Sequence, residues 1–136
     1  MRFMMLIYPQ AKGEGAVPDA KAVAAMMKYN EELTKAGVLL ALDGLQPSAN
    51  GARVTFTGGK RVVRDGPFTE AKELVGGYWL IQVKSKEEAV EWAKRCPVDE
   101  GEMIEVRQVF DAADHSNVTH ETAAAAAKVS KALGKP

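Results

Sequence analysis

The sequence predicts an α+β fold in which two helices cover one side of an antiparallel sheet. Short apolar runs that end at turn residues alternate with two amphipathic stretches at helical spacing. A Gly-Gly pair separates two segments that are rich in residues favouring strands. With 136 residues, the chain is long enough for one domain with its own core and too short for two ordinary ones.

The first two elements are a buried strand and an amphipathic helix. The strand is predicted over Phe3–Tyr8, a continuous apolar run that Pro9 ends. A helix then begins near Pro18 and Asp19, because proline is tolerated in the first turn. Gly37 is expected to end the helix as a C-cap residue. The apolar stripe of this helix consists of Ala22, Met26, Tyr29, Leu33 and Ala36.

A β-hairpin is predicted in the middle of the chain. Residues 53–57 and 60–64 flank Gly58-Gly59, which a two-residue primed turn favours. The pairs expected from this turn are Phe56 with Arg61 and Val54 with Val63. Strand alternation then places Val54, Phe56, Arg61, Val63 and Asp65 on one face, and Thr55, Val62 and Arg64 on the other.

The remaining elements complete the predicted order. A second strand covers Val38–Leu42, and a third covers Tyr78–Val83. Ser85 is expected to cap a second helix with Glu88 in a capping box, and the last strand runs over Met103–Phe110. Without the hairpin this order is βαββαβ, the ferredoxin-like arrangement with both helices on one side of the sheet.

The predicted sheet is apolar on both faces, although its two helices can cover only one. Phe3–Ile7, Val38–Leu42 and Trp79–Ile81 are continuous apolar runs, whereas a strand with one wet face would alternate. An apolar patch of that size is not left in water, and a second copy of the same sheet is the simplest cover. The sequence therefore predicts a homodimer that packs sheet against sheet.

Composition excludes several kinds of partner. Eighteen basic and eighteen acidic residues cancel, so no global field attracts nucleic acid or an anionic membrane. One cysteine excludes an internal disulfide and suits a reducing compartment. No run reaches the roughly 18 apolar residues of a membrane span, and no secretion signal is recognised. We expect a cytoplasmic protein without nucleic-acid or membrane partners. Because the sequence contains no phosphate loop and no dinucleotide fingerprint, we expect no cofactor.

The composition changes after Phe110. We predict a domain over residues 1–112 and a C-terminal tail over residues 113–136. The tail is expected to be either a solvated Ala-rich helix from Thr119 to about Leu133, with Thr119 as its cap, or a frayed segment. Metal-ligand residue types occur here, but their spacing fits no compact site, so no metal is expected. These residues are Asp111, Asp114, His115, His120 and Glu121.

Asp65 is the candidate for chemistry because of the turn that follows it. A turn aspartate usually accepts a hydrogen bond from the backbone two residues on, but Pro67 has no N–H. The register aims this carboxylate at the apolar face of its hairpin, where it needs a partner or has a raised pKa. The alternative is a structural aspartate that accepts from the N–H of Phe68 or Thr69 and holds the turn.

Five blocks of the sequence together resemble one family. They are MRFMMLIYP, GVLLALDGLQPS, RDGPFTEAKELVGGYWLIQV, EEAVEWAKRCP and IEVRQVF, which span Met1 to Phe110 in that order. This pattern is similar to the YCII-related family, in the branch with a DGPF motif. The resemblance implies a ferredoxin-like domain that forms a dimeric α+β barrel. It also implies a cleft between the two sheets, with Asp65 near it.

The resemblance does not supply an activity. Relatives in the YCII group proper pair this aspartate with a histidine on the first helix, which suggests acid–base chemistry on a small molecule. Here the helix reads MMKYNEEL, and the only histidines lie in the tail. Tyr29 or Glu32 is the available substitute. The other candidate ligand contacts are Tyr8, Asp43, Pro67, Phe68 and Glu73.

Two functions remain open from the sequence. One is a dimer that binds a small organic molecule in a cleft at its interface and performs acid–base catalysis with Asp65. The other is a non-catalytic dimeric module that binds a metabolite or a protein. The residues do not decide whether the protein is an enzyme.

Overall fold

A computed structural model describes residues 1–9, 18–70, 73–111, 114 and 119–134. Its strands are β1 (Arg2–Tyr8), β2 (Leu39–Gly44), β3 (Ala52–Thr57), β4 (Lys60–Asp65), β5 (Gly77–Gln82) and β6 (Met103–Gln108). Its helices are α1 (Ala20–Lys35), α2 (Lys86–Arg95) and α3 (His120–Ala132), with a short 3-10 turn at Ser48–Asn50.

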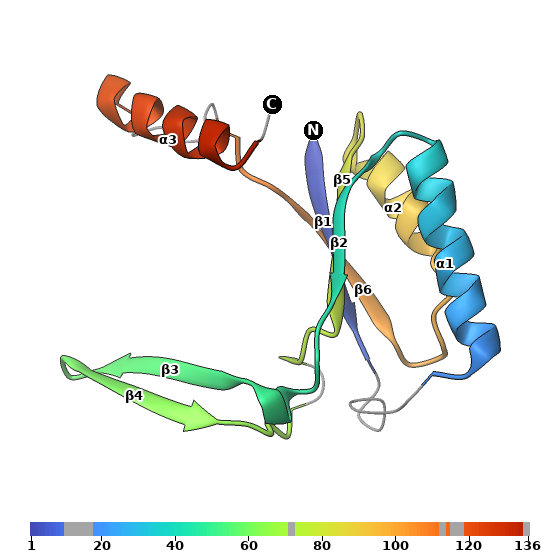
Figure 1. Cartoon of the computed structure of the whole chain (residues 1–136), viewed down its shortest axis with the longest axis horizontal. Coiled ribbons are helices and arrows are strands. Elements are labelled where there is room, and N and C mark those ends of the chain that lie inside the picture. The colour runs from blue at the N-terminus through green and yellow to red at the C-terminus, as the bar shows by residue number, and fades with distance from the viewer. Residues whose placement is uncertain (10–17, 71–72, 112–113, 115–118, 135–136) are drawn as a thin grey trace.

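Four strands form an antiparallel sheet in the order β2-β5-β1-β6, and both α1 and α2 lie on one side of it (Figure 1). The α+β class and the predicted order of elements are therefore confirmed, and they are consistent with a ferredoxin-like fold. Several strand ends differ from prediction by one or two residues. The largest differences are that β2 reaches Gly44 rather than Leu42 and that β6 ends at Gln108 rather than Phe110. Asp43 consequently lies within a strand rather than in the turn after it.

Both helices begin close to the predicted positions: α1 follows Asp19, which is its cap, and α2 follows the predicted cap Ser85. Asp19 accepts from the N–H of Ala22 at 2.7 Å, and Ser85 accepts from the N–H of Glu88 at 3.2 Å. Each of these contacts satisfies a backbone donor that the first turn leaves without a partner. The core between helices and sheet contains Phe3, Met5, Tyr29, Leu33, Val38, Trp79, Ile81, Val83, Ala89, Trp92 and Cys96.

The opposite side of the sheet also carries apolar side chains. Met4 lies opposite Leu80, and Leu6 lies opposite Tyr78, in the register of β1 with β5. All four residues are only half-buried, and no described element covers them. In Figure 1 the hairpin and α3 extend away from the sheet on the side opposite α1 and α2. The sheet is thus apolar on both faces, as predicted, and the described chain covers only the face that packs against α1 and α2.

The hairpin has the predicted register and forms a two-stranded sheet of its own. Phe56 pairs with Arg61, and Val54 pairs with Val63. Gly58 and Gly59 both have positive φ, at 58° and 76°, as a primed turn requires. Phe56 is 72% exposed and Val63 64% exposed, so this face of the hairpin packs on nothing in the described chain.

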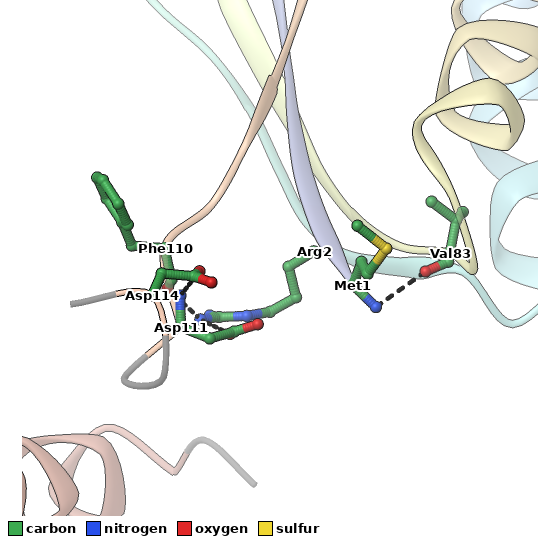
Figure 2. Close-up of polar contacts among 6 residues, drawn as sticks. All are labelled: Met1, Arg2, Val83, Phe110, Asp111 and Asp114. Carbon is green, nitrogen blue, oxygen red and sulfur yellow. Dashed lines mark hydrogen bonds and ion pairs between the residues drawn. The ribbon is translucent and has the colours of Figure 1, made fainter. Parts of the chain in front are cut away.

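The first two residues, Met1 and Arg2, make polar contacts with other segments at one end of the sheet (Figure 2). The amino group of Met1 donates to the carbonyl of Val83 at 2.9 Å. The guanidinium of Arg2 donates to the carbonyl of Phe110 at 3.1 Å and forms an ion pair with Asp111 at 3.2 Å. The Arg2 contacts attach Phe110 and Asp111, the residues after β6, to β1.

The C-terminal helix α3 begins directly after Thr119, the cap that the sequence predicts. Thr119 accepts from the N–H of Thr122 at 3.1 Å, and the Thr122 hydroxyl accepts from the N–H of Thr119 at 2.8 Å. None of the residues of α3 is buried. None of the described helices is both long and apolar enough to cross a membrane.

Removing residues 117–136 should leave the domain folded, because α3 buries no residue and the Arg2–Asp111 contact is retained. We expect the melting temperature, followed by circular dichroism, to change by less than about 5 °C. A larger decrease would show that the tail packs on the domain.

Candidate functional site

The turn after β4 packs tightly against the 3-10 turn at Ser48–Asn50. The N–H of Gly66 donates to the carbonyl of Gly51 at 3.0 Å, and the Gly66–Pro67 peptide bond is cis. A Cβ atom at Gly66 would lie 1.8 Å from the carbonyl oxygen of Ser48, which is too close for any side chain. The glycine of the DGPF sequence is therefore needed for close approach of two backbones.

The same turn buries Phe68. Its N–H donates to the hydroxyl of Ser48 at 3.0 Å, and its side chain is 8% exposed. The predicted structural role of Asp65 relied on accepting from this N–H or from that of Thr69. In the structure Ser48 takes the N–H of Phe68 instead, so the turn is held by contacts that do not involve the carboxylate.

Asp65 is the last residue of β4 and lies opposite Ala52. It is on the same hairpin face as Val63 and Arg61, as the register predicted. Its side chain is exposed and makes no hydrogen bond or ion pair with the described residues. Of the neighbouring candidates, Pro67 is exposed and Phe68 is buried beneath the hairpin.

A pocket of about 260 Å³ lies between α1 and the adjoining ends of β1, β2 and β5. It is lined by Ile7, Met26, Met27, Asn30, Leu42, Asp43, Gly44, Gly76, Gly77, Tyr78 and Trp79. Gly44, Gly76 and Gly77 contribute no side chains to it. A Cβ atom at Gly77 would lie 2.9 Å from the carbonyl of Asp43, so the β2–β5 contact also depends on this glycine.

Two polar pairs involve residues that border the pocket, and of these the Asn30–Trp79 pair lies on the helix side of the sheet, where the pocket is. The hydroxyl of Tyr78 donates to Asp43 at 3.1 Å, and this hydrogen bond raises the pKa of Tyr78 because it favours the protonated phenol. The indole N–H of Trp79 donates to the side-chain oxygen of Asn30 at 2.9 Å. An apolar pocket with a few placed polar groups is typical of a site for a small organic molecule.

Tyr29, a candidate for ligand contact, lies in the core and does not line the pocket. Its hydroxyl donates to the carbonyl of Trp92 at 2.6 Å, and its ring contacts Trp79 edge-on with centroids 5.9 Å apart. Burial raises the pKa of Tyr29 above its usual range, which keeps the phenol protonated. Burial likewise raises the pKa of Cys96 to about 12, so its thiol stays neutral and is a poor nucleophile.

The other predicted candidates lie apart from the pocket lining. Tyr8 ends β1 and pairs with Met103 on the side of the sheet without helices. Glu32 and Glu73 are exposed. No three described metal-ligating side chains converge on one point, and His115 lies outside the described residues.

Sequence reasoning missed most of the pocket. Asp43 was a candidate, but Asn30, Tyr78 and Trp79 were assigned only to the helix and the strand that contain them. Their convergence depends on how α1 lies across the end of β5, for which the sequence contains no local signal. The one available hint was Gly76-Gly77 before an aromatic strand, which marks a close backbone approach.

The family model of the YCII-related domain matches residues 1–113 of this chain. The chain therefore belongs to the YCII-related family, in agreement with the resemblance found in its sequence blocks. A relative from Rhizobium meliloti (strain 1021), "Uncharacterized protein R00369", is 30% identical over 76 residues. That match covers 56% of this chain and 61% of the relative, so the chain spans less than two thirds of it.

Replacing Gly66 with alanine should destabilise the base of the hairpin, because the new Cβ atom would overlap the Ser48 carbonyl. We expect a loss of about 3 kcal/mol in urea unfolding, or faster hydrogen exchange at the Phe68 amide if the turn opens locally. Gly44→Ala is the matched control, since nothing lies within 4 Å of its Cβ position. Equal stability of the two variants would contradict the backbone contact at Gly66.

Proposed function

We propose that this YCII-related protein is a homodimer that binds a small organic molecule in the pocket between α1 and the sheet. The observation that supports this most directly is the apolar pocket of about 260 Å³ with the Asn30–Trp79 pair between α1 and β5. An apolar cavity of about 150 Å³ holds benzene. A one- or two-ring molecule with one polar substituent is therefore the expected size class.

The uncovered side of the sheet supports the dimer. Met4, Leu6 and Leu80 lie there without a covering element in the described chain. A second copy would remove this surface from water and would also cover exposed hairpin residues such as Phe56. A two-stranded hairpin is only marginally stable alone, so contact with a partner would stabilise it.

The dimer would lie next to the pocket. The side chains of Asp43 and Tyr78 alternate with the helix-facing residues Leu42 and Trp79, so they belong to the uncovered side. Both residues also belong to the strand ends that border the pocket. A partner sheet on that side would exclude water from the Asp43–Tyr78 pair and would lie directly behind the strands that form the pocket floor.

Asp65 is the proposed acid or base. Its carboxylate is exposed and without a polar partner in the described chain, on the hairpin face that carries Val63 and Phe56. Covering that face with a partner copy would remove the carboxylate from bulk water and place it beside a molecule bound at the interface, where it can give or take a proton. The non-catalytic alternative is favoured by the absence of a second acid–base group in polar contact with Asp65 among the described residues.

Leu6→Asp should dissociate the dimer, because an unpaired charge would be buried between the two sheets. Sedimentation at micromolar concentration should give twice the monomer mass for the unaltered protein and the monomer mass for the variant. Val23→Asp, on an exposed position of α1, is the control that should stay dimeric. A folded, unaltered protein that sediments as a monomer would contradict the proposed dimer.

Ligand binding can be tested by NMR titration with phenol, benzoate and 2-naphthol. We expect saturable shifts at the pocket residues, and Met26→Trp should weaken them at least about tenfold by filling the space. Val23→Trp is the control on the same helix, since Val23 does not line the pocket. Shifts that spread over the surface, or that survive in Met26→Trp, would contradict the proposed site.

Catalysis by Asp65 needs a separate test, because Asp65 does not line the pocket and the three titrated molecules carry no carbon-bound proton that a carboxylate can remove. If the partner copy brings Asp65 to the bound molecule, the protein in D2O should exchange the proton next to the carbonyl of an aryl ketone, and Asp65→Asn should slow this by about 10²–10⁴-fold. Unchanged binding without exchange in either protein would favour the non-catalytic module.

A further inference from the structure

The hairpin face opposite Asp65 contains two arginines in an unusual arrangement. Arg53 of β3 and Arg64 of β4 lie directly opposite each other in the hairpin register. The guanidinium carbon of Arg53 is 3.9 Å from the centroid of the Phe68 ring, and that of Arg64 is 5.3 Å from the same centroid. Both guanidinium groups therefore contact the same buried aromatic ring, from one face of the hairpin.

Neither arginine has a counter-ion in the described chain. Like charges directly opposite on two strands destabilise a hairpin. Every acidic residue except Glu14 lies in the described ranges, and none of those described forms an ion pair with Arg53 or Arg64. Lys60 and Arg61 add further positive charge to the hairpin, whereas Asp65 is its only acid. The hairpin is thus basic in a protein whose net charge is zero.

The aromatic platform is rigid. Phe68 is 8% exposed, its N–H is bound by Ser48 at 3.0 Å, and the preceding Gly66 packs against the Ser48 carbonyl. Stacking on a ring occupies the flat face of a guanidinium and leaves the N–H donors at its edge available. Two such edges fixed side by side match the oxygens of a carboxylate or phosphate, which arginine binds in a bidentate manner.

We propose that Arg53 and Arg64, supported by Phe68, form a binding site for the oxyanion group of a small molecule, either a carboxylate or a phosphate. The anion neutralises the repulsion between the two guanidinium groups and receives charge-assisted hydrogen bonds from both. Phe68 acts as the positioning residue. The site is separate from the pocket between α1 and the sheet, since none of its residues lines that pocket.

The test is a titration of the full-length protein with inorganic phosphate and, separately, with acetate, at constant ionic strength. The side-chain N–H resonances of Arg53 and Arg64 report binding by NMR. We expect saturable shifts at both arginines, and Arg53→Gln or Arg64→Gln should weaken binding at least about tenfold. The anion that binds more tightly identifies the oxyanion group as phosphate or carboxylate.

Arg61→Gln is the matched control, because it removes the same charge from the other face of the same hairpin. It should change the affinity less than about twofold if the site depends on geometry rather than on net charge. Since Arg64 and Arg61 are both exposed, both variants are expected to fold.

Three results would overturn the proposal. One is the absence of saturable shifts up to about 10 mM of either anion, well above the affinity that two charge-assisted contacts should provide. Another is equal weakening by Arg61→Gln, which would indicate only a diffuse field. The third is dissociation of a dimer by Arg64→Gln with no effect on anion binding, which would assign the arginines to a contact with a second copy. The pocket titration is independent, so failure of one site leaves the other standing.

Discussion

The contact between the backbones of Gly66 and Ser48 determines the geometry of the hairpin. It leaves no room for a Cβ atom at Gly66, and it brings the Ser48 hydroxyl within 3.0 Å of the Phe68 N–H. Phe68 is then fixed beneath Arg53 and Arg64. Asp65, one residue before the glycine, points to the opposite face of the hairpin. Strand alternation separates the face that carries Arg53 and Arg64 from the face that carries Arg61, Val63 and the carboxylate, and the backbone contact places Phe68 against the first of these faces.

The sheet imposes a second constraint. Because β1 and β5 are apolar on both sides, α1 and α2 can bury only Phe3, Met5, Trp79, Ile81 and their neighbours. Met4, Leu6 and Leu80 remain on the other side, towards which the hairpin and α3 extend (Figure 1). The proposed dimer follows from this surplus of apolar surface, since the hydrophobic effect favours covering it and the chain itself does not.

The two candidate sites differ in chemistry. The pocket beside α1 is apolar, and the Asn30–Trp79 hydrogen bond that borders it joins two neutral side chains. The arginine pair is charged, lies on the hairpin and has no acidic partner in the described chain. A single ligand with an aromatic part and an acidic group has chemistry that suits both, but each site has its own physical basis and its own test.

The sequence by itself determined the elements and their order, because those depend on local chemistry. Asp19, Ser85 and Thr119 cap helices whose first turns follow them directly, and Gly58-Gly59 set the hairpin register that also places Arg53 opposite Arg64. Only the tertiary structure decided what these elements bring together. Asn30 meets Trp79, Asp43 meets Tyr78, and Ser48 meets Phe68 across separations of 49, 35 and 20 residues. Such contacts depend on how a helix or turn lies on a strand far away in the chain, and neither periodicity nor capping contains that information.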